Sequence, residues 1–314
     1  METQKNIVQV VAYFDMFHYP VSLTEIHRFL HVSISTRQME PLLQQLVDQK
    51  KIFSFGEFYS LRNDHSLVTQ RRNGNERADR LLPTAYRVGK LLHRFPFVKG
   101  VGISGSLSKN YADEEADIDF FIITEANKLW IARSLLHGLK KLSFIFGKQH
   151  WLCMNYFVDE TALELIEKNI FIATEVVTLK PVVVSSAMQK FFSANDWTKS
   201  YFPNDSQDTG FTNEPRPWSK KLIESIFNNR AGNWLDNYLM RVTEKRWLQK
   251  EKRCKLNMKG EIQSLRVSKH FARPNPEFFQ KKILALYDAK LKNLEQECLV
   301  EPEESFYFLR KEII

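Results

Sequence analysis

Residues 97–124, FVKGVGISGSLSKNYADEEADIDFFIIT, constrain the fold of this chain more than any other stretch. The apolar run at 98–103 is typical of a short buried strand. A Ser-Gly-Ser tripeptide at 104–106 interrupts that run, and a second apolar run follows at 120–123. The stretch therefore predicts two strands of one buried sheet, connected through a tight turn and a polar segment.

Two acids, Asp117 and Asp119, stand at the start of the second run with Ile118 between them. Successive side chains of a strand point to opposite faces, so the two carboxylates share one face and Ile118 points into the core. Neighbouring carboxylates repel each other and are costly to desolvate. A divalent cation removes that cost, and Mg²⁺ favours one or two carboxylates together with substrate phosphate oxygens. We therefore expect Asp117 and Asp119 to bind Mg²⁺.

The turn before the acids is suited to a phosphate ligand. Gly105 permits a backbone conformation that other residues avoid, and it lets a ligand approach the backbone closely. Exposed N–H groups at such a turn, with the Ser106 hydroxyl, suit phosphate oxygens. A phosphate-binding turn that faces a carboxylate pair predicts metal-assisted phosphoryl or nucleotidyl transfer.

Gly105-Ser106, a spacer and the Asp-Ile-Asp triplet at 117–119 together resemble the signature of the DNA polymerase β-like nucleotidyltransferase superfamily. The motif itself covers residues 97–125. The order of expected helices and strands agrees with the superfamily over residues 95–200. It implies Mg²⁺-dependent transfer of a nucleoside monophosphate from an NTP to an acceptor hydroxyl, with release of pyrophosphate. The residues that it assigns to the triphosphate are Gly105, Ser106, Ser108 and Lys109.

The strand expected at 151–158 departs from that superfamily, which usually places a third carboxylate there. This strand carries Asn155 instead, and the nearest acids, Asp159 and Glu160, follow its end. Asn155 is a candidate neutral ligand or substrate contact, and Asp159 is a candidate third carboxylate if the strand is offset. A site that binds nucleotide without efficient turnover is a third interpretation, and a hydrogen bond from Asn155 to a nearby loop is the interpretation without a functional role.

Glu175 lies among apolar residues of the helix expected at 170–179. An acid in such surroundings is either a paired core carboxylate or an active-site group. Antibiotic nucleotidyltransferases related to the superfamily take a general base from outside the metal pair. We therefore regard Glu175 as a candidate catalytic base.

Residues 1–62 predict a small unit of their own, with three helices and a hairpin around Gly56. This order resembles a winged-helix domain, whose third helix is the recognition helix. Arg37 on that helix is offset by Glu40 and Asp48, so we expect the unit to pack within the protein and to bind duplex DNA weakly or not at all.

The whole chain predicts an α+β fold in three parts. A winged-helix-like domain at 1–62 precedes a nucleotidyltransferase domain at 63–202. The third part is a helical C-terminal domain at 203–314, which begins with a polar linker or long loop rich in Pro and Gly, residues 203–217.

Composition indicates a cytoplasmic protein without a membrane segment. No apolar run approaches the roughly 20 residues that a membrane helix needs. The first residues lack the pattern of a signal peptide. The three cysteines are too widely spaced to predict a disulfide framework or a zinc site.

The formal net charge is +8, and residues 216–282 carry 17 Lys and Arg against 6 Asp and Glu. Such an excess favours a polyanionic partner, although a solvated helix surface explains it equally well. The charges are spread round their helices beside acids such as Glu244, which slightly favours a small-molecule acceptor over a nucleic acid. The competing function is a non-catalytic regulator that senses nucleotide or binds nucleic acid.

Overall fold

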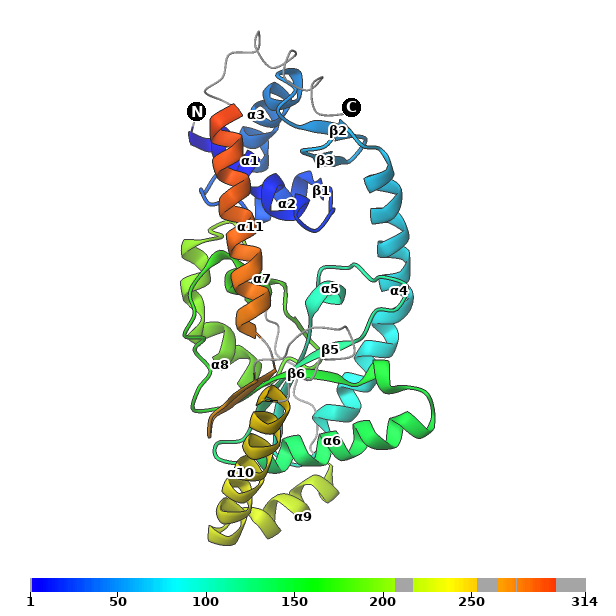
Figure 1. Cartoon of the computed structure of the whole chain (residues 1–314), viewed down its shortest axis with the longest axis vertical. Coiled ribbons are helices and arrows are strands. Elements are labelled where there is room, and N and C mark those ends of the chain that lie inside the picture. Colours follow the sequence, from blue (N-terminus) through cyan, green and yellow to red (C-terminus); the bar gives the residue numbers. More distant parts are fainter. Residues whose placement is uncertain (1, 207–216, 253–264, 275, 298–314) are drawn as a thin grey trace. The chain divides into compact units, whose positions relative to one another are not determined.

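A computed structural model describes residues 2–206, 217–252, 265–274 and 276–297 of the chain (Figure 1). Packing divides the chain into two compact units. The first unit comprises residues 1–68 and 279–314, and the second comprises residues 69–278.

Three helices and a small antiparallel sheet form the N-terminal part of the first unit. In chain order these elements are α1 (Glu2–Asp15), β1 (Val21–Ser22), α2 (Leu23–Arg28), α3 (Thr36–Asp48), β2 (Phe53–Phe55) and β3 (Phe58–Ser60). Strand β3 lies between β1 and β2. Ser22 and Ser35 begin α2 and α3, because each side chain accepts a hydrogen bond from a backbone N–H in the first turn. The three expected helices and the hairpin are confirmed.

The C-terminal helix of the first unit, α11 (Pro276–Glu297), packs against α1. The Tyr287 hydroxyl donates a hydrogen bond to the backbone oxygen of Gln9 over 3.3 Å. Asp15 at the end of α1 is buried and forms ion pairs with Lys290 and Arg62. These contacts join two segments that are far apart in the sequence.

A six-stranded sheet of order β7-β4-β5-β6-β9-β8 forms the centre of the second unit. Its strands are β4 (Val98–Ser104), β5 (Asp119–Thr124), β6 (Cys153–Asp159), β7 (Lys180–Pro181), β8 (Leu265–Val267) and β9 (Phe271–Pro274). Strands β5 and β6 run parallel, whereas the other neighbouring pairs are antiparallel. The strands expected near 98–103, 120–123 and 151–158 are confirmed, as is the α+β character of the chain.

Helices cover both faces of this sheet. The first face is covered by α4 (Ser66–His93), α6 (Leu129–Ile145) and α10 (Arg230–Lys252), and the second by α7 (Ile170–Thr178) and α8 (Ser186–Ala194). Alternation along β5 supplies both cores, because Phe120 and Ile122 point to the first face and Phe121 and Ile123 to the second. The remaining helices are α5 (Gly105–Ser108), η1 (Gln149–Trp151), η2 (Asp196–Ser200) and α9 (Trp218–Phe227).

The C-terminal third differs from expectation. Residues 218–297 were expected to be helical, but β8 and β9 interrupt the helices and extend the central sheet. The expected domain at 203–314 does not form one unit, because α9 and α10 pack with the sheet whereas most of α11 packs with the first unit. Much of the predicted linker, and residues 253–264 of the basic region, lie outside the described residues.

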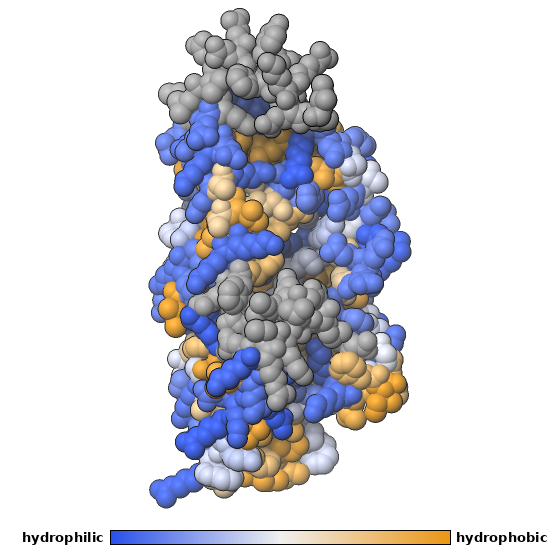
Figure 2. All heavy atoms as spheres, in the orientation of Figure 1, coloured by the Kyte–Doolittle hydropathy of each residue, from blue (hydrophilic) through white to orange (hydrophobic). Residues whose placement is uncertain are grey.

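The surface of the second unit is apolar in places. Figure 2 shows apolar side chains near the end of α6 and over α9 and α10. Among the large apolar residues of α6, of its C-terminal end and of α9 and α10, the most exposed are Ile145, Phe146, Trp218 and Trp234. Among the described helices, none combines the length and the apolar character needed to cross a membrane.

Candidate functional site

The candidate site lies where β4 ends and β5 begins. The two strands are antiparallel, and Ser104, the last residue of β4, pairs with Asp119, the first residue of β5. The short helix α5 starts at Gly105, directly after this pair. The turn predicted to bind phosphate and the acid predicted to bind metal are therefore neighbours in the sheet.

Gly105 is the residue that allows this close approach. Its φ angle is +70°, in the left-handed region that side chains disfavour. A Cβ atom at this position would lie 2.6 Å from Oδ2 of Asp119. Glycine thus leaves the carboxylate in place and keeps the backbone of the turn open beside it.

The serines of the turn have different surroundings. Ser106 is exposed, so its hydroxyl is accessible to a ligand. Ser108 is buried, and its Oγ donates to the backbone oxygen of Gly105 over 2.8 Å. The Ser108 hydroxyl also donates to the hydroxyl oxygen of Thr178 over 3.4 Å. Ser108 therefore fixes the shape of the turn, whereas Ser106 remains the better candidate for direct contact with a phosphate.

Lys109 and Glu175 meet beside the turn. The Nζ atom of Lys109 lies 2.7 Å from Oε1 of Glu175 and 3.1 Å from the backbone oxygen of Gly105. Glu175 comes from α7, on the sheet face toward which Asp119 also points. The structure thus brings Glu175 to the site, but its carboxylate contacts the lysine ammonium group. In this arrangement Glu175 positions Lys109.

His150 is a site residue that the sequence interpretation missed. Its Nδ1 atom lies 2.9 Å from Oδ1 of Asp117, and its backbone oxygen accepts a hydrogen bond from the N–H of Ile118. The His150 side chain is 49% exposed, so it is able to turn away from Asp117. The sequence did place a histidine shortly before the third expected strand. Because β5 and β6 run parallel, the residues that precede them, Asp117 and His150, lie at the same end of the sheet.

Cys153 is the second residue that the sequence interpretation missed. It pairs with Asp119 across β5 and β6, and a register shift follows at Asn155, which stands opposite no residue of β5. Burial, together with the charge of Asp119, raises the pKa of the Cys153 thiol to about 12. A neutral thiol therefore lies beside Asp119 at pH 7. The side chain of Asn155 is outside the described part of the structure, so its role as a ligand stays a prediction.

Asp159, considered above as a third carboxylate, lies at the other end of β6. It pairs with Thr124, at the opposite end of β5 from Asp119. The five residue steps from Asp119 to Thr124 span about 17 Å. Its buried carboxylate accepts hydrogen bonds from the backbone N–H groups of Asn127 and Thr161. Asp159 therefore stabilises a loop and does not reach the site.

The two carboxylates of the site suit a Mg²⁺ ion that takes most of its ligands from water and from substrate phosphate oxygens. Asp117 and Asp119 are both partly exposed. Among the described residues, no group of three or more His, Cys, Asp or Glu side chains is arranged to hold a metal ion. Mg²⁺ commonly uses one or two carboxylates and completes its shell with water and phosphate oxygens. The two carboxylates, next to an open turn, meet that requirement.

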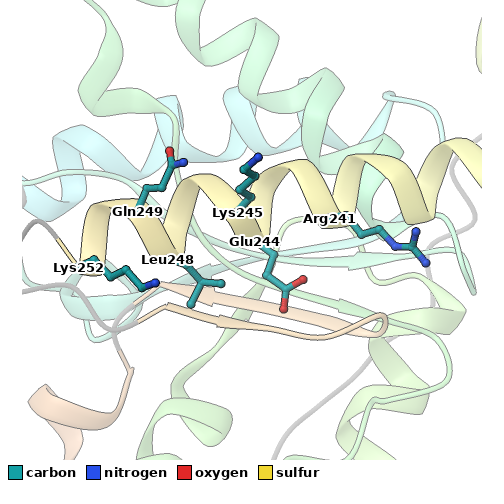
Figure 3. Close-up of a pocket in the computed structure, with 6 residues that line it drawn as sticks. All are labelled: Arg241, Glu244, Lys245, Leu248, Gln249 and Lys252. Carbon is teal, nitrogen blue, oxygen red and sulfur yellow. The ribbon is translucent and has the colours of Figure 1, made fainter.

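A separate pocket of about 300 Å³ lies along α10 (Figure 3). The residues that line it are Arg241, Glu244, Lys245, Leu248, Gln249 and Lys252. All six belong to one helix, and none is a predicted site residue. The pocket is thus a feature of the basic surface of α10 and not of the carboxylate site.

Comparison with known proteins finds no matching family model, curated protein or solved structure. Functional inference for this chain therefore depends on its own residues and their geometry.

Proposed function

We propose that this chain is a Mg²⁺-dependent nucleotidyltransferase, which transfers a nucleoside monophosphate from an NTP to an acceptor hydroxyl. The observation that carries the proposal is the pairing of Ser104 with Asp119, which sets the Gly105 turn directly against the carboxylate. A phosphate held by that turn lies beside the acids that would hold its counter-ion.

Each residue of the site has a distinct role in this proposal. Asp117 and Asp119 hold Mg²⁺, which when bound neutralises charge on the phosphates and polarises the reacting groups. The backbone of Gly105 and the hydroxyl of Ser106 contact the triphosphate. Lys109, positioned by Glu175, adds positive charge at the turn.

The proposed reaction is one displacement at the α-phosphorus of the NTP. The acceptor oxygen forms a bond to that phosphorus, the bond to the bridging oxygen of pyrophosphate breaks, and the hydroxyl proton passes to solvent. Little covalent chemistry is required of the protein, so positioning and electrostatic stabilisation supply most of the rate enhancement.

The test is release of pyrophosphate from NTPs in the presence of Mg²⁺ and a panel of hydroxyl acceptors. Asp119→Asn is expected to abolish release, because it removes charge from the metal site. Glu115→Gln is the matched control, since Glu115 is an exposed acid in the segment before β5. Equal activity of wild type and Asp119→Asn would refute the assignment of the metal site.

The second candidate function is a nucleotide-sensing regulator. The observation that favours it is the neutral thiol of Cys153 in register with Asp119, where a third negative charge would strengthen metal binding. A sensor binds NTP with Mg²⁺ but releases no pyrophosphate with any acceptor. The same assay, combined with a binding measurement, separates the two functions.

The finer architecture belongs to the same proposal. The second unit would be a polymerase β-like nucleotidyltransferase core, and the first unit would be a winged-helix-like packing module in a cytoplasmic protein. On α3, exposed Arg37 stands among the exposed acids Glu40 and Asp48, which disfavours binding to DNA phosphates. Sequence-specific DNA binding by the full chain at physiological salt, lost in Arg37→Gln, would overturn this role of the first unit.

A further inference from the structure

A group of basic side chains lies on α6 and α10, on the first face of the sheet. We call it the α6–α10 cluster. Its members are Arg133, His137, Lys140, Lys141 and Lys250. The two helices pack against each other within the second unit (Figure 1).

Aromatic rings hold the inner part of the α6–α10 cluster. The guanidinium carbon of Arg133 lies 4.6 Å from the ring centre of Trp247 and 5.5 Å from that of Trp130. The His137 ring stacks on Phe157, with 6.4 Å between centres. The contacts with the two tryptophans favour the Arg133 cation and fix its position, and the stacking on Phe157 fixes the His137 ring. The inner residues of the cluster are therefore ordered before any ligand binds.

The α6–α10 cluster carries positive charge without matching negative charge. Within the described part of the chain, none of its five members forms an ion pair with a carboxylate. Nε2 of His137 is shielded from water and has no hydrogen-bond partner among the described residues. Burial, together with the charges of Arg133, Lys140, Lys141 and Lys250, lowers the pKa of His137 to about 3. Like charges brought together in this way are relieved by a bound anion.

The α6–α10 cluster extends to the same end of the sheet as the carboxylates. Helix α6 leads from the end of β5 back to the start of β6, so its last turns lie near the start of β6. The charge of Lys140 accordingly acts on the thiol of Cys153, which pairs with Asp119. Asp119 itself points to the other face, where Lys109 contacts Glu175 of α7, whereas Leu107 of the turn packs in the core of the first face. The cluster would therefore approach the carboxylates from the first face, and the Gly105 turn from the end of the sheet where β4 ends.

We propose that the α6–α10 cluster binds a phosphate group of the acceptor, while the Gly105 turn binds the triphosphate of the NTP. This inference rests on the proposed function, because it assigns the second substrate of the same site. The phosphate belongs either to a phosphorylated small molecule or to a nucleic-acid strand, and both sources present the same anion to the cluster.

The test measures binding of two probes, ribose 5-phosphate and a short single-stranded oligonucleotide, to the full chain without Mg²⁺ or NTP. Lys140→Gln, Lys141→Gln and Lys250→Gln are combined in one variant. The matched control combines Arg241→Gln, Lys245→Gln and Lys252→Gln, three charges that lie on the opposite face of α10 from Lys250 and line the pocket of Figure 3.

The cluster variant is expected to bind the phosphate-bearing probe at least about tenfold more weakly than wild type, and the control less than about threefold more weakly. Mg²⁺-dependent NTP binding is expected to be unchanged in the cluster variant. Loss confined to the oligonucleotide, with a steep dependence on salt, assigns a nucleic-acid acceptor, and loss for ribose 5-phosphate assigns a small molecule.

Three results would overturn the inference: neither probe binds, the control loses as much affinity as the cluster variant, or the cluster variant loses NTP affinity. Its failure is distinguishable from that of the proposed function. Pyrophosphate release that depends on Asp119 but not on the cluster would refute the inference alone. Phosphate binding at the cluster without pyrophosphate release by wild type would refute the proposed nucleotidyl transfer, and the bound phosphate would then not belong to an acceptor substrate.

Discussion

Replacing Gly105 with alanine tests the central geometry of the site with a single methyl group. The new Cβ would lie 2.6 Å from Oδ2 of Asp119, closer than real Cβ contacts. Either the turn or the carboxylate must move. The carboxylate is the end of a short side chain, so its rotation is the easier adjustment, and it takes the proposed metal ligand out of position.

The expected cost in stability is modest. Holding alanine at φ near +70° costs roughly 1–2 kcal/mol, and turning Asp119 away from a preferred rotamer adds about 0.5–1.5 kcal/mol. Gly147 supplies the matched control, because its φ is +63° in the same unit and a Cβ there would meet no atom within 4 Å. Gly147→Ala should therefore carry the backbone cost alone.

The two variants are compared by denaturant unfolding and by titration with a non-hydrolysable NTP in Mg²⁺. Gly105→Ala and Gly147→Ala should differ by about 1 kcal/mol in free energy of unfolding. Only Gly105→Ala should weaken Mg²⁺-dependent nucleotide binding, by about tenfold or more, equivalent to about 1.4 kcal/mol. Equal nucleotide affinity in the two folded variants would refute the assignment of this turn to the phosphate.

Two further predictions concern stability. Burial raises the pKa of Asp236 from 3.8 to about 6, so this group contributes stability below about pH 4 that is lost as the pH rises through 6. The free energy of unfolding of Asp236→Asn, measured by denaturation between pH 4 and 7, should fall less with rising pH than that of wild type. An equal fall in both proteins would contradict this assignment. Lys220 is buried and donates to the backbone oxygens of His93 and Val98, so Lys220→Met should cost about 1–3 kcal/mol, whereas exposed Lys221→Met should cost under about 0.5 kcal/mol.

The strand–turn–strand centre of the site is readable from local sequence. Apolar runs on either side of a Ser-Gly-Ser turn predict buried strands, and the spacing of Asp117 and Asp119 predicts that both share one face, although β5 itself begins at Asp119. The pairing of Ser104 with Asp119 follows from these elements once they are antiparallel neighbours. Local pattern was sufficient here because every relevant contact lies within about 20 residues of sequence.

Contacts between distant segments were not readable in the same way. Cys153 lies beside Asp119 because of the parallel register of β5 and β6 and the bulge at Asn155, neither of which has a local signature. The pairing of Glu175 with Lys109 depends on how α7 packs. Strands β8 and β9 were mistaken for helix because they are short and carry charged residues. Their conformation is decided by pairing with distant strands, since β9 pairs with β6 and β8 pairs with β9.

The measurement that tests the account most directly is the Mg²⁺ dependence of nucleotide binding. A non-hydrolysable NTP is titrated calorimetrically into wild type, Asp119→Asn and the control Glu115→Gln, each with and without Mg²⁺. Mg²⁺ should strengthen binding by at least about tenfold in wild type and the control, and should have no effect in Asp119→Asn. The same Mg²⁺ dependence in all three proteins would contradict a metal-assisted nucleotide site at this strand.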